Sequence, residues 1–331
     1  MHEFALIREL LAPLAHAPGA YGLEDDAAWV PPTMGQEWVL TQDAVVAGVH
    51  FFADDPPGCI ARKALRVNLS DIAAKGAQPQ GYLLTLALPA STTREWLEAF
   101  VEGLAQDQQA YAIGLLGGDT VVTPGPLMIS VTMLGTVPHA QRLRRSGACV
   151  GDRVYVSGTL GDSALGLRLQ QQNIAPHTAG CGHYETLIAR YRLPQPRLAL
   201  GQTLRNVASS AMDISDGVLQ DLGHLCAASG VGAKLYIADM PLSNAAQHYL
   251  PTVAGDAALA METLSLCGGD DYELLFTVPK HIQAGQLGDD PSVPVTCVGE
   301  IVAEAGVRVM DAAGRVLPIT NLGYQHILRE D

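Results

Sequence analysis

The sequence has little positive charge and no long apolar run. Its 331 residues include 20 lysines and arginines against 34 aspartates and glutamates, for a formal net charge of -14. Because a nucleic-acid surface needs clustered Lys and Arg to neutralise phosphates, nucleic acid is not an expected partner. The apolar stretches GYLLTLALPA and PLMISVTMLGTV are too short for membrane spans and contain Thr and Ser. We therefore expect no membrane partner.

Paired cysteines are also missing. The six cysteines are scattered and none has CxxC spacing, which argues against a zinc site or a redox pair. Isolated thiols in a chain of this size are typical of a reducing compartment. The first residues, MHEFALIREL, carry charges and lack the apolar core of a secretory signal. These features predict a soluble, cytoplasmic protein.

The common nucleotide-binding signatures are missing as well. The chain has no GxxxxGK(S/T) loop, no protein-kinase motif set and no GxGxxG after a strand. A nucleotide would have to be held in another way, by the Gly117–Gly118 pair, by metal ions, or by a cation such as Arg145. A glycine pair after a strand is by itself more often only a turn, so this signal is weak.

Helix and strand patterns alternate along the chain and predict an α/β or α+β fold. The first half has helical spacing over 3–14, 58–75 and 94–112, strand patterns over 81–89 and in PLMISVTMLGTV, and shorter strands that end at Gln42–Asp43 and just before Asp119. Glycine-rich turns near 144–152 separate two predicted domains, 1–147 and 148–331. The second half resumes with the strand pattern RVYVSG, followed by a mostly helical stretch over 184–205 around a PQP break and by the strand end AMDIS. A helix from DGVLQDLGHL and the strand patterns KLYIADMPL, YELLFTVP, PVTCVGEI and VRVMD complete it.

Aspartates recur where apolar segments meet turns or helices: Asp25, Asp26, Asp43, Asp71, Asp119, Asp213 and Asp216. Singly, each has an ordinary explanation, since Asp216 could cap a helix and Asp71 could pair with Lys75 at i, i+4. Together they are harder to explain, because carboxylates buried without partners are costly. Magnesium takes such oxygen ligands and shares them with substrate phosphates. The pattern predicts magnesium-dependent phosphoryl transfer.

The ordered set of motifs resembles the thiamine-monophosphate kinase family, within the aminoimidazole-ribonucleotide synthetase-like superfamily. The strongest run is NLSDIAA, GGDT, DISDG and GGDDYEL, and further pieces from EFALI to GYQHI extend it over nearly the whole chain. The resemblance implies a homodimer of two-domain α/β subunits, in which residues 1–147 bind metal and nucleotide and their sheets pair in a barrel, while 148–331 form a second α/β domain. It also implies that ATP phosphorylates thiamine phosphate, with several magnesium ions between aspartates and the triphosphate.

The resemblance also assigns residues to each part of a site. The metal ligands it implies are Asp26, Thr41, Gln42, Asp43, Asp71, Asp119, Asp213 and Asp216. The ATP contacts would be Gly118, Asp119, Arg145 and Ser215, and the thiamine phosphate contacts would be His50, Asp270 and Tyr324. Because the acceptor is already an ionised phosphate, direct in-line transfer needs no general base. We therefore do not expect His50 to be a nucleophile.

This chain departs from the family pattern at four positions. Gln42 stands where the family usually has a hydroxyl residue, Lys75 where it has an apolar one, Asp270 in place of a glutamate, and Glu24 in place of a small residue. Two alternatives to the kinase therefore stay open. One is another ATPase of the same superfamily, and the other is a metal- and nucleotide-binding relative whose turnover Gln42 and Lys75 have weakened.

Overall fold

A computed structural model describes residues 3–174, 181–254, 265–287, 293–319 and 323–324. The chain divides into two compact units, and the first consists of residues 1–72 and 77–142 while the second consists of 73–76 and 143–331. Each unit contains its own sheet. The expected mixture of helices and strands around two separate sheets is therefore present. In the described ranges, no helix has the length and apolar character needed to cross a membrane.

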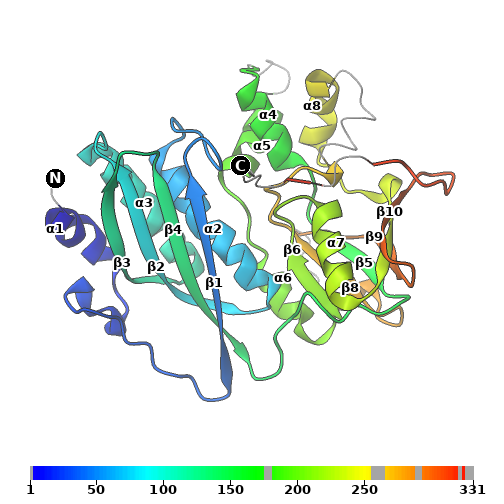
Figure 1. Cartoon of the computed structure of the whole chain (residues 1–331), viewed down its shortest axis with the longest axis horizontal. Coiled ribbons are helices and arrows are strands. Elements are labelled where there is room, and N and C mark those ends of the chain that lie inside the picture. The colour runs from blue at the N-terminus through cyan, green and yellow to red at the C-terminus, as the bar shows by residue number, and fades with distance from the viewer. Residues whose placement is uncertain (1–2, 175–180, 255–264, 288–292, 320–322, 325–331) are drawn as a thin grey trace, which may run out of the picture. The chain divides into compact units, whose positions relative to one another are not determined.

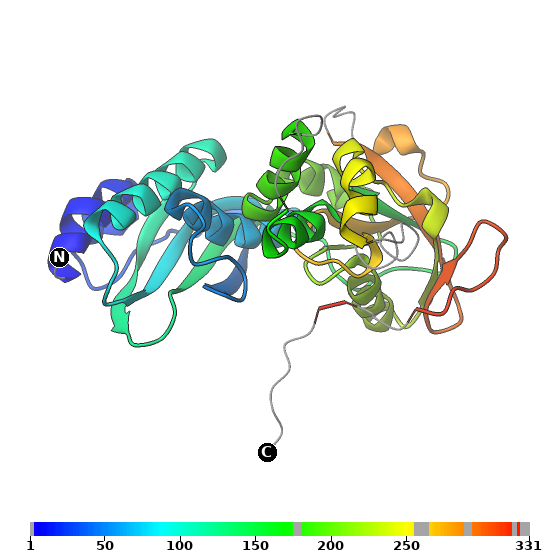
Figure 2. The same cartoon turned by 90° about the horizontal axis from the view of Figure 1, so that it is seen from above.

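The first unit is built on a four-stranded sheet in the order β1-β4-β2-β3. Its strands are β1 (Gln36–Val46), β2 (Gln78–Pro89), β3 (Gly114–Thr123) and β4 (Met128–Pro138). β4 runs antiparallel to β1 and β2, whereas β3 runs parallel to β2, so β2 and β3 need a crossover connection. Helix α3 (Arg94–Tyr111) supplies it, and α3 and α2 (Pro57–Ala74) lie on the same face of the sheet (Figures 1 and 2).

Both helices form close to the ranges that the sequence predicts, for reasons visible in the structure. At the start of α3, the Thr93 hydroxyl accepts a hydrogen bond from the Trp96 amide at 3.2 Å, which satisfies one of the free amides of the first turn. The stripe of Leu97, Phe100 and Leu104 is buried. The helices therefore pack their apolar faces onto one side of the sheet, and the other side, which we call the open face, points away from them.

Some predicted element ends were wrong. β1 continues past Asp43 to Val46, and β3 continues past Asp119 to Thr123, so both aspartates lie within strands. Each strand pairs with a neighbour along this length, and sheet pairing extends strands beyond their local sequence signal. The N-terminal segment, predicted to be helical over 3–14, is α-helical only over α1 (Glu3–Leu6). A π-helix (Ile7–Leu11) follows, and then a 3-10 helix (Ala12–Leu14) that contains Pro13.

The second unit has a six-stranded mixed sheet in the order β10-β7-β9-β5-β8-β6. Its strands are β5 (Arg153–Ser157), β6 (Ser210–Asp213), β7 (Gly232–Tyr236), β8 (Leu274–Val278), β9 (Val295–Val302) and β10 (Gly306–Met310). Helix α7 (Val218–Ser229) packs on one face, where Leu222 and Leu225 join a core with Val156. On the other face Tyr155 and Phe276 form a second core.

The remaining helices of the second unit form a group of their own. Helices α4 (Asp162–Gln171), α5 (Cys181–Arg192) and α8 (Asn244–Ala254) share a core that includes Leu165, Leu187 and Tyr249. The PQP break predicted within the helical stretch 184–205 is present between α5 and α6 (Leu198–Thr203). Pro194 and Pro196 stand in the break, because proline cannot donate the backbone bond of a helix interior.

Candidate functional site

In the first unit, polar side chains meet between β1 and α2. The Thr41 hydroxyl donates a hydrogen bond to Asp71 Oδ2. The Asp43 amide donates to Oδ1 of the buried Asn68 at 3.1 Å. Thr41 and Asp43 are two residues apart on a strand and therefore share the face that α2 covers. The structure brings Thr41, Asp43 and Asp71 together, and it adds Asn68, which lies on α2 three residues before Asp71.

The charges in this group are close enough to disturb each other. Burial first, and then the nearby Asp71 carboxylate, raise the pKa of Asp43 to about 6. Two neighbouring carboxylates in a desolvated place each favour a proton or a cation. Carboxylate and hydroxyl oxygens are also the ligands that magnesium takes. The group therefore fits a divalent cation, which would remove the repulsion between the two carboxylates.

The raised pKa of Asp43 predicts how a substitution at this position changes the stability of the metal-free protein. The folded-state pKa, about 6, lies above the usual value of 3.8, so the ionised Asp43 carboxylate destabilises the metal-free chain above pH 6. This destabilisation decreases as the pH falls from about 6 towards 3.8. We expect Asp43→Asn to stabilise the metal-free protein at pH 8 by about 1–2 kcal/mol. Urea unfolding in EDTA at pH 8 and pH 4 measures this, with the difference vanishing at the lower pH. Equal or lower stability of the variant at pH 8 would contradict it.

Gln42 points to the other side of the sheet. It pairs across β1 and β4 with Thr132, which pairs in turn with Leu83 of β2, and Leu83 pairs with Gly117 of β3. Laterally paired residues share a face of the sheet, so Gln42 and Gly117 lie on the same face. Asp119 is two residues after Gly117 on β3 and therefore shares that face, which is the open face. The Gln42 amide donates to Ser130 Oγ at 3.1 Å. The structure does not bring Gln42 together with Thr41 and Asp43, but it does place it on the side of Asp119.

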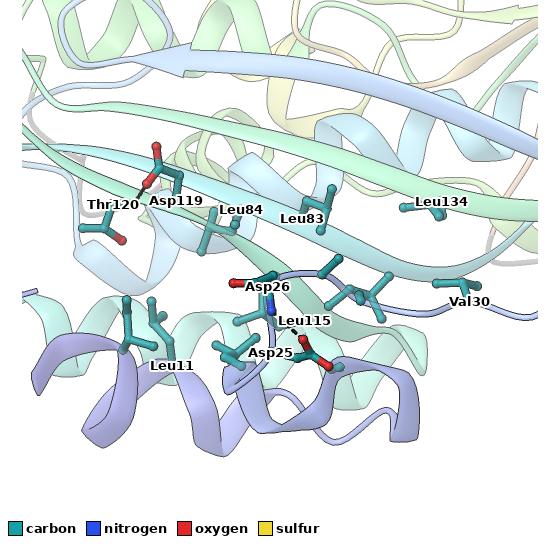
Figure 3. Close-up of a pocket in the computed structure, with 18 residues that line it drawn as sticks. Leu11, Asp25, Asp26, Val30, Leu83, Leu84, Leu115, Asp119, Thr120 and Leu134 are labelled. Carbon is teal, nitrogen blue, oxygen red and sulfur yellow. Dashed lines mark hydrogen bonds between the residues drawn. The ribbon is translucent and has the colours of Figure 1, made fainter. Parts of the chain in front are cut away.

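A cavity of about 540 Å³ lies between β3 and the N-terminal segment (Figure 3). Asp25 and Asp26 come from the chain that follows the 3-10 helix Pro18–Leu23, and Asp119 comes from β3. The Asp26 amide donates to Asp25 Oδ1 at 2.8 Å, and Asp119 Oδ1 accepts from the Thr120 amide at 2.9 Å. The other walls are mainly apolar, formed by residues such as Ile7, Leu11, Leu83, Leu115 and Leu134. The cavity thus has acidic groups on two sides and an apolar lining between them.

Packing against β2 explains one glycine of the GGDT motif. A Cβ at Gly118 would lie 1.8 Å from the Leu84 carbonyl oxygen, whereas a Cβ at Gly117 would meet only the Leu83 side chain at 3.4 Å. Gly118 is therefore required where the β2 backbone comes close to β3. Its residue type is explained by the sheet itself, so it is no independent sign of a phosphate contact.

In the second unit, the predicted residues gather around the turn 214–217, which joins β6 to α7. Asp213 is the last residue of β6 and is buried. The Asp270 amide donates to the Ser215 carbonyl at 2.8 Å, and the Tyr324 amide donates to the Asp216 carbonyl at 3.0 Å. The structure thus brings Asp270 and Tyr324, expected at the substrate, to the turn that carries Asp213, Ser215 and Asp216.

The segment beside this turn has a strained backbone. Asp270 and Tyr272 have φ values of 66° and 51°, in the left-handed region that residues with a Cβ rarely occupy. The Tyr272 hydroxyl donates to Asp270 Oδ1 at 3.2 Å. Two such residues in one short segment are typical of a functional site, because a fold keeps strain only where other contacts enforce it.

Asp221 is a residue of this region that the sequence reading missed. It lies in the first turn of α7, is 2% exposed, and accepts hydrogen bonds from the amides of Ser215 and Asp216 at 3.0 and 3.1 Å. The pKa of Asp221 is raised to about 7, mainly by burial. The carboxylates of Asp213 and Asp216 also raise it, and the hydrogen bonds from the two amides lower it. The available signal was a carboxylate on the same face of the helix as Val218, Leu222 and Leu225, which is otherwise apolar.

The Asp216 side chain does not cap helix α7. Gly217 occupies the N-cap position of α7, and no side chain caps the helix there. The Asp216 carboxylate instead accepts a hydrogen bond from the Gln220 amide at 3.1 Å, and the same amide group donates to the Tyr324 carbonyl at 2.8 Å. Gln220 therefore joins Asp216 to Tyr324.

The last two predicted residues lie in turns. His50 Nδ1 accepts a hydrogen bond from the Val46 amide at 3.1 Å, so its other ring nitrogen carries the proton in the neutral form. The His50 carbonyl accepts from the buried Lys63 ammonium at 2.8 Å. Arg145, in the second unit, is exposed and makes no hydrogen bond or ion pair to the described part of the chain. Its guanidinium is available to an anion.

The described ranges contain no group of three His, Cys, Asp or Glu side chains placed to hold a metal ion. Magnesium commonly binds through one or two carboxylates and completes its shell with water and substrate phosphates. The pair of Asp43 and Asp71 suits that kind of binding, in which a phosphate supplies the ligands that the protein does not.

Comparisons with known proteins identify the family. Residues 24–137 match the N-terminal domain and residues 150–311 the C-terminal domain of AIR synthase related proteins. The thiamine-monophosphate kinase of Caulobacter vibrioides is 41% identical over 331 residues, which covers 98% of this chain and 90% of that protein. The chain belongs to the thiamine-monophosphate kinase family.

Solved structures of the family agree with this fold. The crystal structure of thiamine-monophosphate kinase from Stenotrophomonas maltophilia K279a has a TM-score of 0.82 and 39% identity, and the match covers 93% of this chain and 96% of that one. The structure of AaThiL complexed with AMPPCP and TMP has a TM-score of 0.77 and 30% identity over 98% of this chain and 97% of that one. Members of the thiamine-monophosphate kinase family thus share both units of this chain.

Proposed function

We propose that this protein phosphorylates thiamine phosphate with ATP and releases thiamine diphosphate and ADP. The observation that carries the proposal is the 41% identity to a thiamine-monophosphate kinase over nearly the full length of both chains. A relative of the same fold is complexed with AMPPCP, an ATP analogue, and TMP. This supports a site that takes a nucleoside triphosphate and thiamine phosphate together.

The proposed reaction is a direct transfer. A phosphate oxygen of thiamine phosphate attacks the γ-phosphorus of ATP, and the new P–O bond forms as the bond to the bridging oxygen of ADP breaks. The attacking oxygen is already ionised, so no side chain has to remove a proton. What the protein supplies is position and charge, which are the main sources of rate in phosphoryl transfer. Arg145, Gly118 and Ser215 are proposed to hold ATP, and His50, Asp270 and Tyr324 to hold thiamine phosphate.

Magnesium is the proposed metal, and its ligands fall into groups. Thr41, Asp43 and Asp71 form one group on the helix-covered side of the first sheet. The others would come from the open face and the cavity (Gln42, Asp119 and Asp26) and from the second unit (Asp213 and Asp216). When bound, magnesium supplies neutralisation of the charge on the triphosphate oxygens. The side chains supply the hard oxygen ligands and keep them in fixed directions.

A homodimer is supported by the open face of the first sheet. Leu40 is 64% exposed, Val121 45% and Leu83 40%, and the strand register puts all three on the open face. An exposed apolar sheet surface of this kind favours burial against a partner. We propose that a second copy of the chain covers it, as in the barrel that the resemblance implies. The roles of domains 1–147 and 148–331 and the cytoplasmic location stay predictions.

Leu40→Glu is expected to convert the dimer to a monomer. The substitution puts a charge into the apolar surface, and a buried charge without a partner is strongly unfavourable. Light scattering after size exclusion at micromolar protein measures the mass. Val122→Glu is the matched control, because Val122 is also exposed but adjoins Val121 on the strand and so points to the opposite side. A dimer in the Leu40 variant would contradict the proposed interface.

The function itself is tested by following ADP and thiamine diphosphate. With ATP and magnesium, the kinase should form ADP only when thiamine phosphate is added, with one thiamine diphosphate for each ADP. ADP formation that ignores thiamine phosphate would favour another ATPase of the superfamily. Stabilisation by nucleotide with no turnover in either case would favour a weakened binding relative.

A further inference from the structure

Backbone N–H and C=O groups of the turn 214–217 find their hydrogen-bond partners outside the turn. Its Ile214 amide donates to the Glu273 carbonyl at 2.9 Å, and the Ile214 and Ser215 carbonyls accept from the Tyr272 and Asp270 amides, each at 2.8 Å. These bonds attach one side of the turn to the strained 270–272 segment. The amides of Ser215 and Asp216 point the other way, so they need an acceptor from elsewhere.

Asp221 provides that acceptor with a single atom. Its Oδ2 accepts from both the Ser215 and the Asp216 amide, at 3.0 and 3.1 Å. A shared acceptor fixes the directions of two successive N–H groups and hence the orientation of the peptide planes between them. The Cα–Cβ bond of Asp216 is fixed as a consequence, and its carboxylate is then held by Gln220 at 3.1 Å.

The buried position of Asp221 gives it little freedom to move. The residue is 2% exposed, and α7 begins immediately after Gly217, whose φ is 111°. A Cβ at Gly217 would lie 2.8 Å from the Cys267 backbone. Asp221 therefore holds the turn from the helix, and the Cys267 backbone packs closely against Gly217 on its other side.

We propose that Asp221 is a positioning residue, which holds the backbone of the 213–216 turn so that the carboxylates of Asp213 and Asp216 face a shared cation, without binding that cation itself. This inference rests on the proposed function, because it assumes that these two carboxylates bind magnesium together with a nucleotide. In this role, Asp221 acts through the position of the oxygen that accepts the two amide hydrogen bonds. The turn does not require the negative charge of the Asp221 carboxylate.

Two substitutions separate geometry from charge. Asp221→Asn removes the charge and keeps an oxygen that can occupy the place of Oδ2, whereas Asp221→Glu keeps the charge and moves the oxygens by one methylene. Binding of AMPPCP is measured by calorimetry over a series of magnesium concentrations, and circular dichroism and thermal melting show that each variant is folded. The readout is the magnesium concentration that gives half-maximal AMPPCP affinity.

We expect Asp221→Asn to shift this concentration by about threefold or less and Asp221→Glu to raise it by about tenfold or more, the equivalent of one or more lost hydrogen bonds. The reverse order, an equal loss in both, or no loss in either would overturn the proposal.

Asp152 is the matched control, since it is also buried and accepts from the Cys149 amide at 2.9 Å and the Ser209 hydroxyl at 2.6 Å. Asp152→Asn should change stability without changing the magnesium response, and a shift equal to that of Asp221→Glu would reduce Asp221 to a structural residue. If the wild-type chain shows no magnesium-dependent AMPPCP binding, the proposed function fails first.

Discussion

Asp71→Asn is expected to lower the rate of thiamine diphosphate formation by about 10²- to 10³-fold or more, the size of effect seen when one preorganised charge-stabilising group is removed. The fold should survive, because an asparagine oxygen can still accept the hydrogen bond from Thr41. What the variant loses is one of the two neighbouring carboxylates, Asp43 and Asp71, between β1 and α2. The measurement is the initial rate at saturating ATP and thiamine phosphate, with circular dichroism as the check of folding.

A neighbouring aspartate provides the control for this variant. Asp54 is exposed and lies in the loop before α2, so Asp54→Asn removes the same charge from the same unit and should leave the rate within about twofold of wild type, as surface substitutions usually do. If Asp71→Asn unfolds the chain and the folded fraction keeps its rate, Asp71 is a structural residue of the helix. The ion pair with Lys75 that the sequence allowed would then be the better account.

Glu273→Gln is expected to destabilise the second unit by about 3–5 kcal/mol, the usual loss when one partner of a buried ion pair is removed. The Glu273 carboxylate is 0% exposed and accepts from the Arg190 guanidinium at 2.7 Å, the Arg197 Nε at 2.6 Å and the Ser157 hydroxyl at 2.6 Å. The substitution leaves two nearly buried guanidinium groups without their shared anion. The measurement is the free energy of unfolding from urea denaturation, followed by circular dichroism.

An exposed ion pair in the same unit shows the contrast. The Arg315 guanidinium is 80% exposed and pairs with Asp311 at 2.7 Å, so Arg315→Ala should change the stability by no more than about 1 kcal/mol. A loss of less than 1 kcal/mol in Glu273→Gln would mean that water or another anion satisfies the two arginines. Because Glu273 directly follows the strained Asp270–Tyr272 segment, we also expect the variant to bind thiamine phosphate more weakly than its remaining folded fraction explains.

Buried polar groups of this kind were largely invisible in the sequence. GGDDYEL was recognisable as a motif, but nothing in its spacing shows that Glu273 meets Arg190 and Arg197, which are far from it along the chain. The same holds for Asp221, whose two amide donors precede it by five and six residues. Side-chain contacts across a turn depend on backbone directions that a residue pattern does not contain.

The sequence alone was enough to determine the family, the mixed fold in two parts, and the helices over 58–75 and 94–112. These follow from local periodicity and from ordered motifs, both of which are properties of neighbouring residues. Only the tertiary structure decided that Gln42 lies on the same face of the sheet as Asp119, that Asp43 and Asp119 lie inside strands, and that Asp221 holds the 214–217 turn. Those facts depend on strand register and on contacts between distant segments, which form only when the chain packs.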